Sequence, residues 1–509
     1  MTRKTRRFLF YIFVVLFIVF VWAIILYSQG YSFDWQKKSL ILTGAFYFKS
    51  YPKEADIYLN NEPKGETNKF VKIKGLLSEK RVDKFVKRLK PGEYEVRISK
   101  PDYYDWQKTL NVKSRLVTEA KNILLVKKNF SKNLVMNYGI KYLSFSNDQK
   151  KMVYLTDEII KEINPAEQKI ADPREISVSS QFSLSLSNLT NNIDTQIYPA
   201  PLVKDMGLTI SSLKNLSNIS WSSDNDKLLL TISPNHYYVV NLKNSSEIID
   251  LNNLIRTISK YTIFSIENLL FHPHNSNKIY FSSENKLYFI ELNNSELSQS
   301  LLSPLTPNIL TYTIGNNILY LGYYESEFYP IQKIYGIYKA NFEGTSFEKI
   351  FDIPNFKSES TATIINEEIF ILDKNLYLFN AQTQILDKIA EGVEKTILSE
   401  DKKKILWKTN NEIGVIWLEP FSEQPQREKY QTEVVMMTFE EINQALWYPK
   451  TNEHIIFVMD DGIKITELDG RDKRNTMDIL SVKNSKVFYN NENNNLYILS
   501  KDKLYQIEF

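Results

Sequence analysis

The sequence predicts an all-β chain preceded by one N-terminal helix. Tyr (31) and Phe (29) are abundant while Gly (15) is scarce, and aromatic side chains suit half-buried pleated surfaces. Short segments in which apolar and polar residues alternate recur between turn residues, as expected for strands with one buried face. A phrase of strand, polar turn, strand, turn and strand also returns along the chain, which indicates repeated supersecondary units. At 509 residues the chain is long enough for two or more domains.

Composition excludes several classes of function. With 63 Lys and Arg against 60 Asp and Glu, the net charge is only +3, which gives no support to a nucleic-acid partner. Cysteine is absent, so disulfides, a thiol nucleophile, Cys-ligated zinc and a lipid anchor on an N-terminal Cys are excluded.

The N-terminus predicts a membrane anchor. Four basic residues precede an uncharged apolar run from Phe8 to Tyr27, about the 20 residues that cross a bilayer core. The basic flank should stay cytoplasmic, while Tyr27, Tyr31 and Trp35 suit the far interface. A cleaved signal peptide is the main alternative, but Ile24–Gly30 is a poor cleavage site. A buried soluble helix is disfavoured because the run is apolar all round. The predicted anchor residues are Arg3, Lys4, Arg6, Arg7, Phe8, Tyr27 and Trp35.

These observations predict the domain order of the chain. Residues 1–30 form the cytoplasmic tail and an uncleaved signal-anchor, and 31–40 form a stalk. Residues 41–128 form a small β domain, because alternating segments such as Ala55–Leu59 and Trp106–Val112 are separated by turn signals at Asn60-Asn61 and Pro91-Gly92. Everything after the helix is then expected outside the cytoplasmic membrane.

Three spaced elements of this small domain resemble the PEGA domain, a small β-sandwich-like module of bacterial and archaeal envelope proteins. They are Tyr51–Asn60, Gly65–Thr67 and Leu89–Trp106. The chain departs from the family pattern at Glu54, where Gly is usual, and at Asn68, where Pro is usual, which puts the first turns in doubt. The resemblance covers under a fifth of the chain and implies envelope display without a known chemistry. Another small β-sandwich is the alternative.

A basic segment interrupts the small domain. Lys80–Arg88 could contact anionic lipid or cell-wall polymer, since each basic residue near an anionic surface contributes about 1 kcal/mol. The more ordinary interpretation of such a run is a solvated strand face.

Residues 133–509 contain eight copies of the repeated phrase. Four short strands per repeat of about 40 residues predict a β-propeller with eight blades, with seven blades as the alternative. The first strands begin near Tyr142, Ile219, Leu269, Ile309, Thr361, Thr396, Ala445 and Lys486.

The turns of the repeats resemble a phrase of WD-like and Tol-type periplasmic propellers. The matching segments are Ser144–Tyr154 and Ile219–Leu228, in which Asn147 and Ser223 replace the usual Pro. This resemblance implies a fold and no particular function.

The last copy ends after its third strand, at Phe509. We expect 133–137 to supply the missing strand, because an exposed edge strand would seed aggregation. An extra segment of roughly 172–214 is predicted as an insertion that protrudes as a hairpin, with a possible role in binding.

Candidate chemistry is sparse. His272 and His274 could bind a metal, but no third ligand with usable spacing is visible and the segment matches an ordinary propeller turn. His236 and His454 are interpreted as structural, and Asp224–Asp226 and Asp460-Asp461 as solvated turns, since calcium needs six or more oxygens. We predict no catalytic, cofactor-binding or metal residues. Four Trp residues are expected in the core between blades rather than as sugar-binding platforms: Trp221, Trp407, Trp417 and Trp447.

The sequence therefore predicts a single-pass membrane protein with a non-catalytic role. It would bind the lipid bilayer through its helix and use the propeller as a scaffold for an envelope protein or cell-wall polymer, with no nucleic-acid partner and no cofactor. An envelope hydrolase or lyase with carboxylates in the propeller funnel is the alternative. A sensor is disfavoured because only about seven residues precede the helix.

Overall fold

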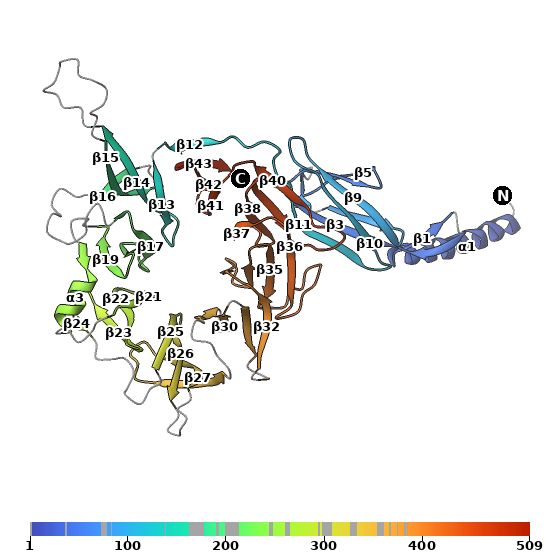
Figure 1. Cartoon of the computed structure of the whole chain (residues 1–509). Helices are drawn as coiled ribbons and strands as arrows, with labels where there is room; N and C mark the ends of the chain where they lie inside the picture. The colour runs from blue at the N-terminus through green and yellow to red at the C-terminus, as the bar shows by residue number, and fades with distance from the viewer. Residues whose placement is uncertain are drawn as a thin grey trace, which may run out of the picture. The chain divides into compact units, whose positions relative to one another are not determined.

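The structure is a computed structural model. It describes residues 3–509 except 36–37, 73–78, 83, 138, 162–177, 190–192, 199–212, 244–247, 260–264, 294–295, 298–307, 326–332, 354–360, 366–367, 374, 381–382 and 384. The chain divides into two compact units. Unit 1 comprises Met1–Ser131, Ile397–Leu406 and Asn411–Lys483, and unit 2 comprises Lys132–Thr396, Trp407–Asn410 and Asn484–Phe509. Figure 1 identifies the elements by colour and label.

The chain begins with helix α1, Arg3–Ser28. Within its segment Thr5–Ser28 the mean hydropathy reaches 3.2 over 18 residues, none of which is buried in the described structure. A helix this long and apolar can cross a bilayer, and a signal sequence has the same properties. The predicted apolar helix is confirmed, whereas its orientation and its retention remain predictions.

The ten residues predicted as a stalk form most of a β-hairpin. Strands β1 (Tyr31–Asp34) and β2 (Ser39–Leu42) pair antiparallel with Phe33 opposite Leu40. The hairpin follows the helix at once, and the backbone N–H and the hydroxyl of Thr43 both donate to the carbonyl of Gly30, at 3.0 and 2.7 Å. The chain is therefore ordered directly beyond the helix instead of running as a linker.

The small domain consists of two sheets around one core. The strand orders are β11-β3-β8 and β10-β9-β4-β5, and β11 runs parallel to β3. Side chains from both sheets, among them Phe46, Ile57, Val96 and Trp106, are at most 2% exposed and form a single apolar cluster. A separate hairpin pairs β6 with β7. The strands are β3 Gly44–Tyr51, β4 Asp56–Leu59, β5 Glu62–Glu66, β6 Lys69–Lys72, β7 Glu79–Val82, β8 Lys84–Leu89, β9 Gly92–Ser99, β10 Trp106–Val112 and β11 Val117–Leu124.

The two departures from the PEGA pattern fall at unusual backbone conformations. Glu54 (φ 57°) and Asn68 (φ 46°) both adopt the left-handed region. Glycine reaches that region without the steric cost that a Cβ brings, which explains why Gly is the more usual residue where Glu54 stands. The predicted turn at Asn60-Asn61 has the same left-handed conformation at both residues, with φ of 50° and 63°. Membership of the PEGA family stays a prediction.

Eight four-stranded antiparallel sheets follow the small domain within the described part of the chain. Seven contain four consecutive strands, and each predicted first-strand start falls inside the first strand of its sheet. This succession of four-stranded meanders is the unit from which β-propellers are built. The sheets of the first four copies are β13 Ile140–Phe145, β14 Lys151–Lys161, β15 Val178–Asn188 and β16 Ile193–Tyr198; β17 Leu216–Trp221, β18 Lys227–Ile232, β19 His236–Asn241 and β20 Ile248–Asp250; β21 Glu267–His272, β22 Asn275–Ser283, β23 Lys286–Glu291 and β24 Glu296–Leu297; and β25 Asn308–Ile314, β26 Ile318–Glu325, β27 Lys333–Ala340 and β28 Phe347–Ile353.

A short helix, α3 (Leu251–Ile258), follows the fourth strand of the second copy. The last four copies continue the pattern of four strands. Their sheets are β29 Thr361–Ile365, β30 Glu368–Asp373, β31 Asn375–Asn380 and β32 Ile385–Glu391; β33 Lys395–Leu398, β34 Lys404–Lys408, β35 Glu412–Trp417 and β36 Thr432–Met437; β37 Ile442–Trp447, β38 His454–Met459, β39 Gly462–Glu467 and β40 Thr476–Leu480; and β41 Ser485–Asn490, β42 Asn495–Ser500 and β43 Lys503–Glu508 with β12 Asn133–Met136.

The segment predicted as an insertion, 172–214, belongs to the first repeat as far as it is described. It supplies β15 and β16, the third and fourth strands of the first sheet, and β15 pairs with β14 along all eleven residues of each strand. Within β15, Leu184 is fully buried and belongs to the same apolar cluster as Val153 and Leu155 of β14. The rest of the segment, 172–177, 190–192 and 199–212, lies outside the described residues.

The predicted pairing of the first and last strands of the repeat region is confirmed. β12 lies antiparallel to β43, with Asn133 opposite Gln506 and Leu134 opposite Tyr505. The first and last sheets also share an apolar cluster in which Met152 and Tyr497 take part. The strand at the edge of the last sheet is therefore covered by a strand from the opposite end of the region, which removes an exposed edge.

A recurring turn joins the first and second strands of three repeats. In each, a Ser hydroxyl donates to an Asp two residues later at 2.5–2.6 Å and accepts the backbone N–H five residues later at 2.9 Å. An Asp that accepts both a hydroxyl and a backbone N–H fixes the turn locally. The three pairs are Ser146 with Asp148, Ser222 with Asp224, and Ser399 with Asp401.

Candidate functional site

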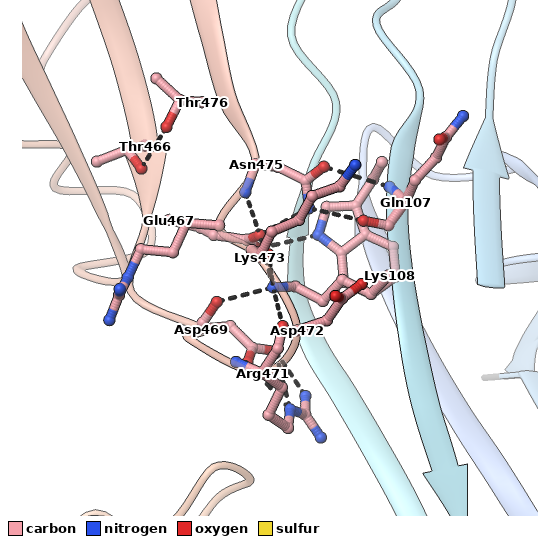
Figure 2. A network of polar contacts seen from close by, with 12 residues as sticks. Gln107, Lys108, Thr466, Glu467, Asp469, Arg471, Asp472, Lys473, Asn475 and Thr476 are labelled. Atoms are coloured by element: carbon pink, nitrogen blue, oxygen red, sulfur yellow. Dashed lines mark hydrogen bonds and ion pairs between the residues drawn. The ribbon is translucent and has the colours of Figure 1, made fainter. Parts of the chain in front are cut away.

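A buried polar network within unit 1 joins the small domain to the seventh repeat. It arises on β10, where Trp106, Lys108, Leu110 and Val112 alternate with exposed residues. Alternation places all four side chains on one face of the strand, so the buried face of an otherwise apolar strand carries a lysine. We call the network of Trp106, Lys108, Glu467, Asn475 and the loop 469–473 the clamp; Figure 2 shows it.

Lys108 is enclosed by oxygen atoms from the seventh repeat. Its Nζ lies 3.1 Å from Oε1 of Glu467, and the side chains are 0% and 4% exposed. The same Nζ donates to the backbone carbonyls of Asp469 (2.8 Å), Arg471 (2.8 Å) and Lys473 (2.6 Å). An ammonium group has three protons, so four acceptors saturate it. The charge is thus paired and hydrogen-bonded, the condition under which a buried charge is tolerated.

Glu467 is the carboxylate at the centre of the clamp. Its Oε2 accepts from Nε1 of Trp106 at 2.8 Å, and its Oε1 accepts from the backbone N–H and the side-chain amide of Asn475, both at 2.7 Å. Burial raises the pKa of Glu467, while the positive charge of Lys108 and the hydrogen bonds from Trp106 and Asn475 oppose that rise. With Lys108 included, both carboxylate oxygens have partners.

The loop that receives Lys108 is itself fixed by an ion pair. Arg471 donates from Nε and Nη2 to the carboxylate of Asp469, at 3.0 and 2.6 Å. Burial alone would raise the pKa of Asp469, but the hydrogen bonds and charge of Arg471 hold it below its ordinary value. The backbone N–H of Thr109 adds a bond to the Asp472 carboxylate at 2.8 Å. The carbonyls that face Lys108 are therefore held in position before the small domain contributes its lysine.

A second contact in unit 1 covers the edge of the small domain. Gln424 mimics a neighbouring strand, because its amide donates to the carbonyl of Val117 at 3.0 Å and accepts from the N–H of Glu119 at 3.1 Å. A cavity of about 30 Å³ remains between the clamp and this contact, lined by Trp106, Ile123, Trp417, Arg427 and others. That volume holds about one water molecule, so the contact is closely packed.

The clamp is built to hold two parts of unit 1 together rather than to carry out a reaction. Lys108, Glu467, Asp469 and Arg471 already have protein partners, so none of these four side chains is a free nucleophile or base directed at a substrate position. Within the part of the chain that the structure describes, no three His, Asp or Glu side chains lie close enough to hold a metal ion.

The predicted anchor residues lie at the start of unit 1. Arg3, Lys4, Arg6, Arg7, Phe8 and Tyr27 belong to α1, and Trp35 follows β1. Phe8 is 67% exposed, Tyr27 57% and Trp35 83%. The guanidinium of Arg88 lies 3.2 Å from the centre of the Tyr27 ring, so the end of α1 touches the basic segment of the small domain.

The other residues singled out from the sequence have local roles. His272 accepts the backbone N–H of His274 at 3.0 Å within their turn. His454 is buried beside the hydroxyl of Thr451, and its burial lowers its pKa to about 3. Asp226 pairs with Lys151 and Lys243, and Asp461 with Lys464. Trp221, Trp407, Trp417 and Trp447 are all at least 91% buried, which agrees with a place in the core.

The sequence interpretation missed the clamp. One signal was present: Lys108 interrupts the apolar phase of Trp106–Val112, and a lysine on a buried face requires a carboxylate or several carbonyls. The partner of Lys108 could not be found in this way, because Glu467 is 359 residues further along the chain. Glu467 also ends a strand whose sequence resembles the strands of the other repeats.

Comparisons with known proteins find likenesses in fold alone. The sequence matches no protein-family model and no curated protein. Among solved structures, the Dos1 propeller has a TM-score of 0.44 and 12% identity over 75% of this chain and 95% of that chain. The C-terminal WD40 domain of Sif2 has a TM-score of 0.43 and 10% identity over 75% and 99%. The β-propeller domain of Myceliophteria thermophila Cps50 (Swd1) has a TM-score of 0.38 and 9% identity over 74% and 100%. At these values they bear on neither activity nor partner.

Proposed function

We propose that this chain is a non-catalytic scaffold or binding protein, tethered to the cytoplasmic membrane by α1, that presents a β-propeller on the outer side. The tether rests on α1, whose most apolar 18 residues include none that is buried in the described structure. Such a surface is unfavourable in water, and a bilayer core would cover it. The basic residues at the start of α1 favour a cytoplasmic N-terminus.

In this proposal the eight sheets are the eight blades of one ring. The support is topological: seven sheets take their strands in chain order, and the eighth is completed by β12 from the start of the region. Covering the last edge with the first strand is how a repeat ring avoids an open sheet edge. A rigid disc of this kind offers loops and a central hollow to an envelope protein or a cell-wall polymer.

The clamp is the observation that carries the scaffold role. A flexible linker would let the propeller move freely on its anchor, whereas the clamp joins the domain that follows α1 to the seventh repeat through a buried ion pair and at least six further hydrogen bonds. Breaking a buried pair by removing one partner costs about 3 to 5 kcal/mol. A joint of that strength fixes how the seventh sheet is held with respect to the anchor domain.

The topology is tested by labelling single cysteines, because the chain has none of its own. In intact cells whose outer layers have been made permeable, a membrane-impermeant maleimide should label Lys501→Cys in the last turn. It should fail to label Thr2→Cys until the membrane is broken. Labelling of Thr2→Cys in intact cells, or release of the protein in soluble form, would contradict the tether.

The binding role is tested with full-length protein in detergent against purified cell-wall polymer and solubilised envelope protein. Saturable binding to one fraction that survives mild clamp variants but is lost on altering propeller loops would support the scaffold. Hydrolysis or cleavage of the polymer, detected by new reducing or unsaturated ends, would contradict the non-catalytic part of the proposal.

A further inference from the structure

The hairpin β1–β2 has the reverse of the usual amphipathic pattern. Alternation places Tyr31, Phe33, Leu40 and Leu42 on one face of its two strands, where Tyr31 and Leu42 are half-buried and Phe33 and Leu40 are exposed, and Trp35 lies just beyond β1. Phe33 is 44% exposed, Leu40 53% and Trp35 83%. The rings of Phe33 and Trp35 touch edge to face, with centroids 4.9 Å apart. A hairpin on a water-soluble domain would turn such residues toward the core.

The opposite face of the hairpin carries Ser32, Asp34, Ser39 and Ile41, and of these Asp34 is buried against the protein. Asp34 is only 4% exposed, and its Oδ1 accepts from Nζ of Lys90 at 3.0 Å. Lys90 precedes the turn between β8 and β9, so this bond ties the hairpin to the small domain. A carboxylate directed inward together with an aromatic pair directed outward is the arrangement expected when the outer medium is less polar than the protein edge behind it.

The position of the hairpin identifies that medium. It follows α1 with only Gln29 and Gly30 between, and the Thr43 bonds to Gly30 hold its far end at the end of the helix. If α1 crosses the bilayer, the hairpin cannot lie far from the membrane surface. Aromatic side chains with one polar atom prefer that interfacial depth.

Basic residues surround the same edge of the domain. Arg88 lies over Tyr27, Lys90 holds Asp34, and the backbone N–H of Arg115 donates to the carbonyl of Thr43 at 3.0 Å. Their side chains are all exposed. Lipid headgroups that carry phosphate would meet this rim with a favourable charge.

We infer that the β1–β2 hairpin is a second membrane contact, in which Phe33, Trp35 and Leu40 enter the outer interface of the bilayer beside α1 and the basic rim meets the headgroups. The inference rests on the proposed tether. It adds that the small domain lies against the bilayer in one orientation, because a helix and a hairpin at separate points remove the freedom that a single anchor leaves. Because the clamp holds the small domain against the seventh sheet, the orientation of that sheet is then fixed as well.

Depth measurements on full-length protein test the inference. Single cysteines replace Trp35 or Leu40 on the hairpin, Val19 in the middle of α1, and Glu62, whose side chain is 73% exposed on another strand. Each carries an environment-sensitive fluorophore, and the protein is reconstituted into vesicles of phosphatidylethanolamine and phosphatidylglycerol. Quenchers are nitroxide lipids, shallow or deep, and aqueous iodide. Unchanged circular dichroism confirms that each variant is folded.

The expected result separates the two proposals. Shallow nitroxide should quench most of the fluorescence at positions 35 and 40, deep nitroxide should quench position 19, and iodide alone should quench position 62. Quenching of position 19 by lipid with quenching of 35 and 40 only by iodide would overturn the hairpin contact and leave the tether intact. Failure of lipid quenching at position 19 would overturn the tether itself. Retention of shallow quenching at 35 and 40 in vesicles of phosphatidylcholine alone would show that the apolar face, rather than the basic rim, makes the contact.

Discussion

The small domain has two contacts of opposite character. At the clamp a charged pair, Lys108 and Glu467, is buried at no more than 4% exposure. At the hairpin, apolar side chains are exposed while the pair of Asp34 and Lys90 is half open to solvent. Strand β10 connects the two regions, since it begins in the clamp and ends at Val112, which lies against Gly44 beside the hairpin.

The two contacts show that the contribution of a charged group to stability depends on its surroundings. The buried pair is costly unless every partner is present, so the clamp should behave as all or none. At the hairpin, Asp34 is buried but the Lys90 ammonium is half exposed, so water can take its place and the pair contributes less. The same domain therefore uses ionic contacts to hold protein and an apolar face to meet another medium.

The largest difference between the two contacts is expected for the variant Lys108→Ala. It leaves the Glu467 carboxylate buried without a cation and three carbonyls without their donor, so we expect a loss of about 3 to 5 kcal/mol of unfolding free energy. Urea denaturation monitored by tryptophan fluorescence would measure it. Lys121→Ala is the matched control, because Lys121 pairs with Glu119 and Glu423 at about a quarter exposure and its removal should cost less than about 1 kcal/mol. Equal losses in the two variants would contradict the clamp.

A milder change at the same site is Glu467→Gln. The amide keeps the shape and can keep the bond from Trp106, but its NH2 group then faces the donors of Asn475, and Lys108 loses its counter-charge. We therefore expect a loss of about 2 to 3 kcal/mol. Hydrogen exchange of the Trp106 and Asn475 amide groups would report local opening. A variant as stable as the parent would show that the three carbonyls alone hold Lys108.

Acid should destabilise the seventh repeat, which carries Glu467 of the clamp. His454 lies opposite Glu467 in β38 and β39, and burial lowers its pKa to about 3. Below pH 6.5 the unfolded chain takes up a proton that folded His454 refuses, so stability is complete above pH 6.5 and falls as the pH drops toward 3. We expect a loss of about 2 kcal/mol at pH 5 from this residue. His454→Gln should flatten the pH dependence of the urea midpoint, and the measurement is the midpoint at a series of pH values in the parent and the variant.

The smallest effect is expected at the hairpin. Lys90→Ala removes a partner that is 52% exposed, so water can replace it at Asp34, and we expect a change of about 0.5 to 1 kcal/mol. Thermal unfolding in detergent would measure it, with Lys64→Ala, another exposed pair, as the control. A loss as large as that of Lys108→Ala would mean that the hairpin is held as tightly as the clamp.

Much of the fold could be predicted because it follows from the local periodicity of apolar and polar residues in the sequence. The eight first strands, the hairpin turn at Asn60-Asn61 and the return of 133–137 to the last repeat follow from alternation, turn residues and the need to cover a sheet edge. The segment 172–214 was misjudged because Ser and Asn dominate its text, although Leu184 continues the apolar phase of β15. Strands β14 and β15 of the first repeat, with eleven residues each, are also longer than the strands of the other repeats, which displaced the expected boundaries.

The sequence by itself determined the apolar helix, the β class and the repeat, because each depends on neighbours a few residues apart. Only the tertiary structure decided where Lys108 finds its carboxylate and which face of β1–β2 turns outward. Pairing of Lys108 with Glu467 depends on strands β10 and β39, which are far apart in the sequence, so no local pattern can predict it. The outward face depends on Lys90 drawing Asp34 inward, a choice that alternation alone leaves open.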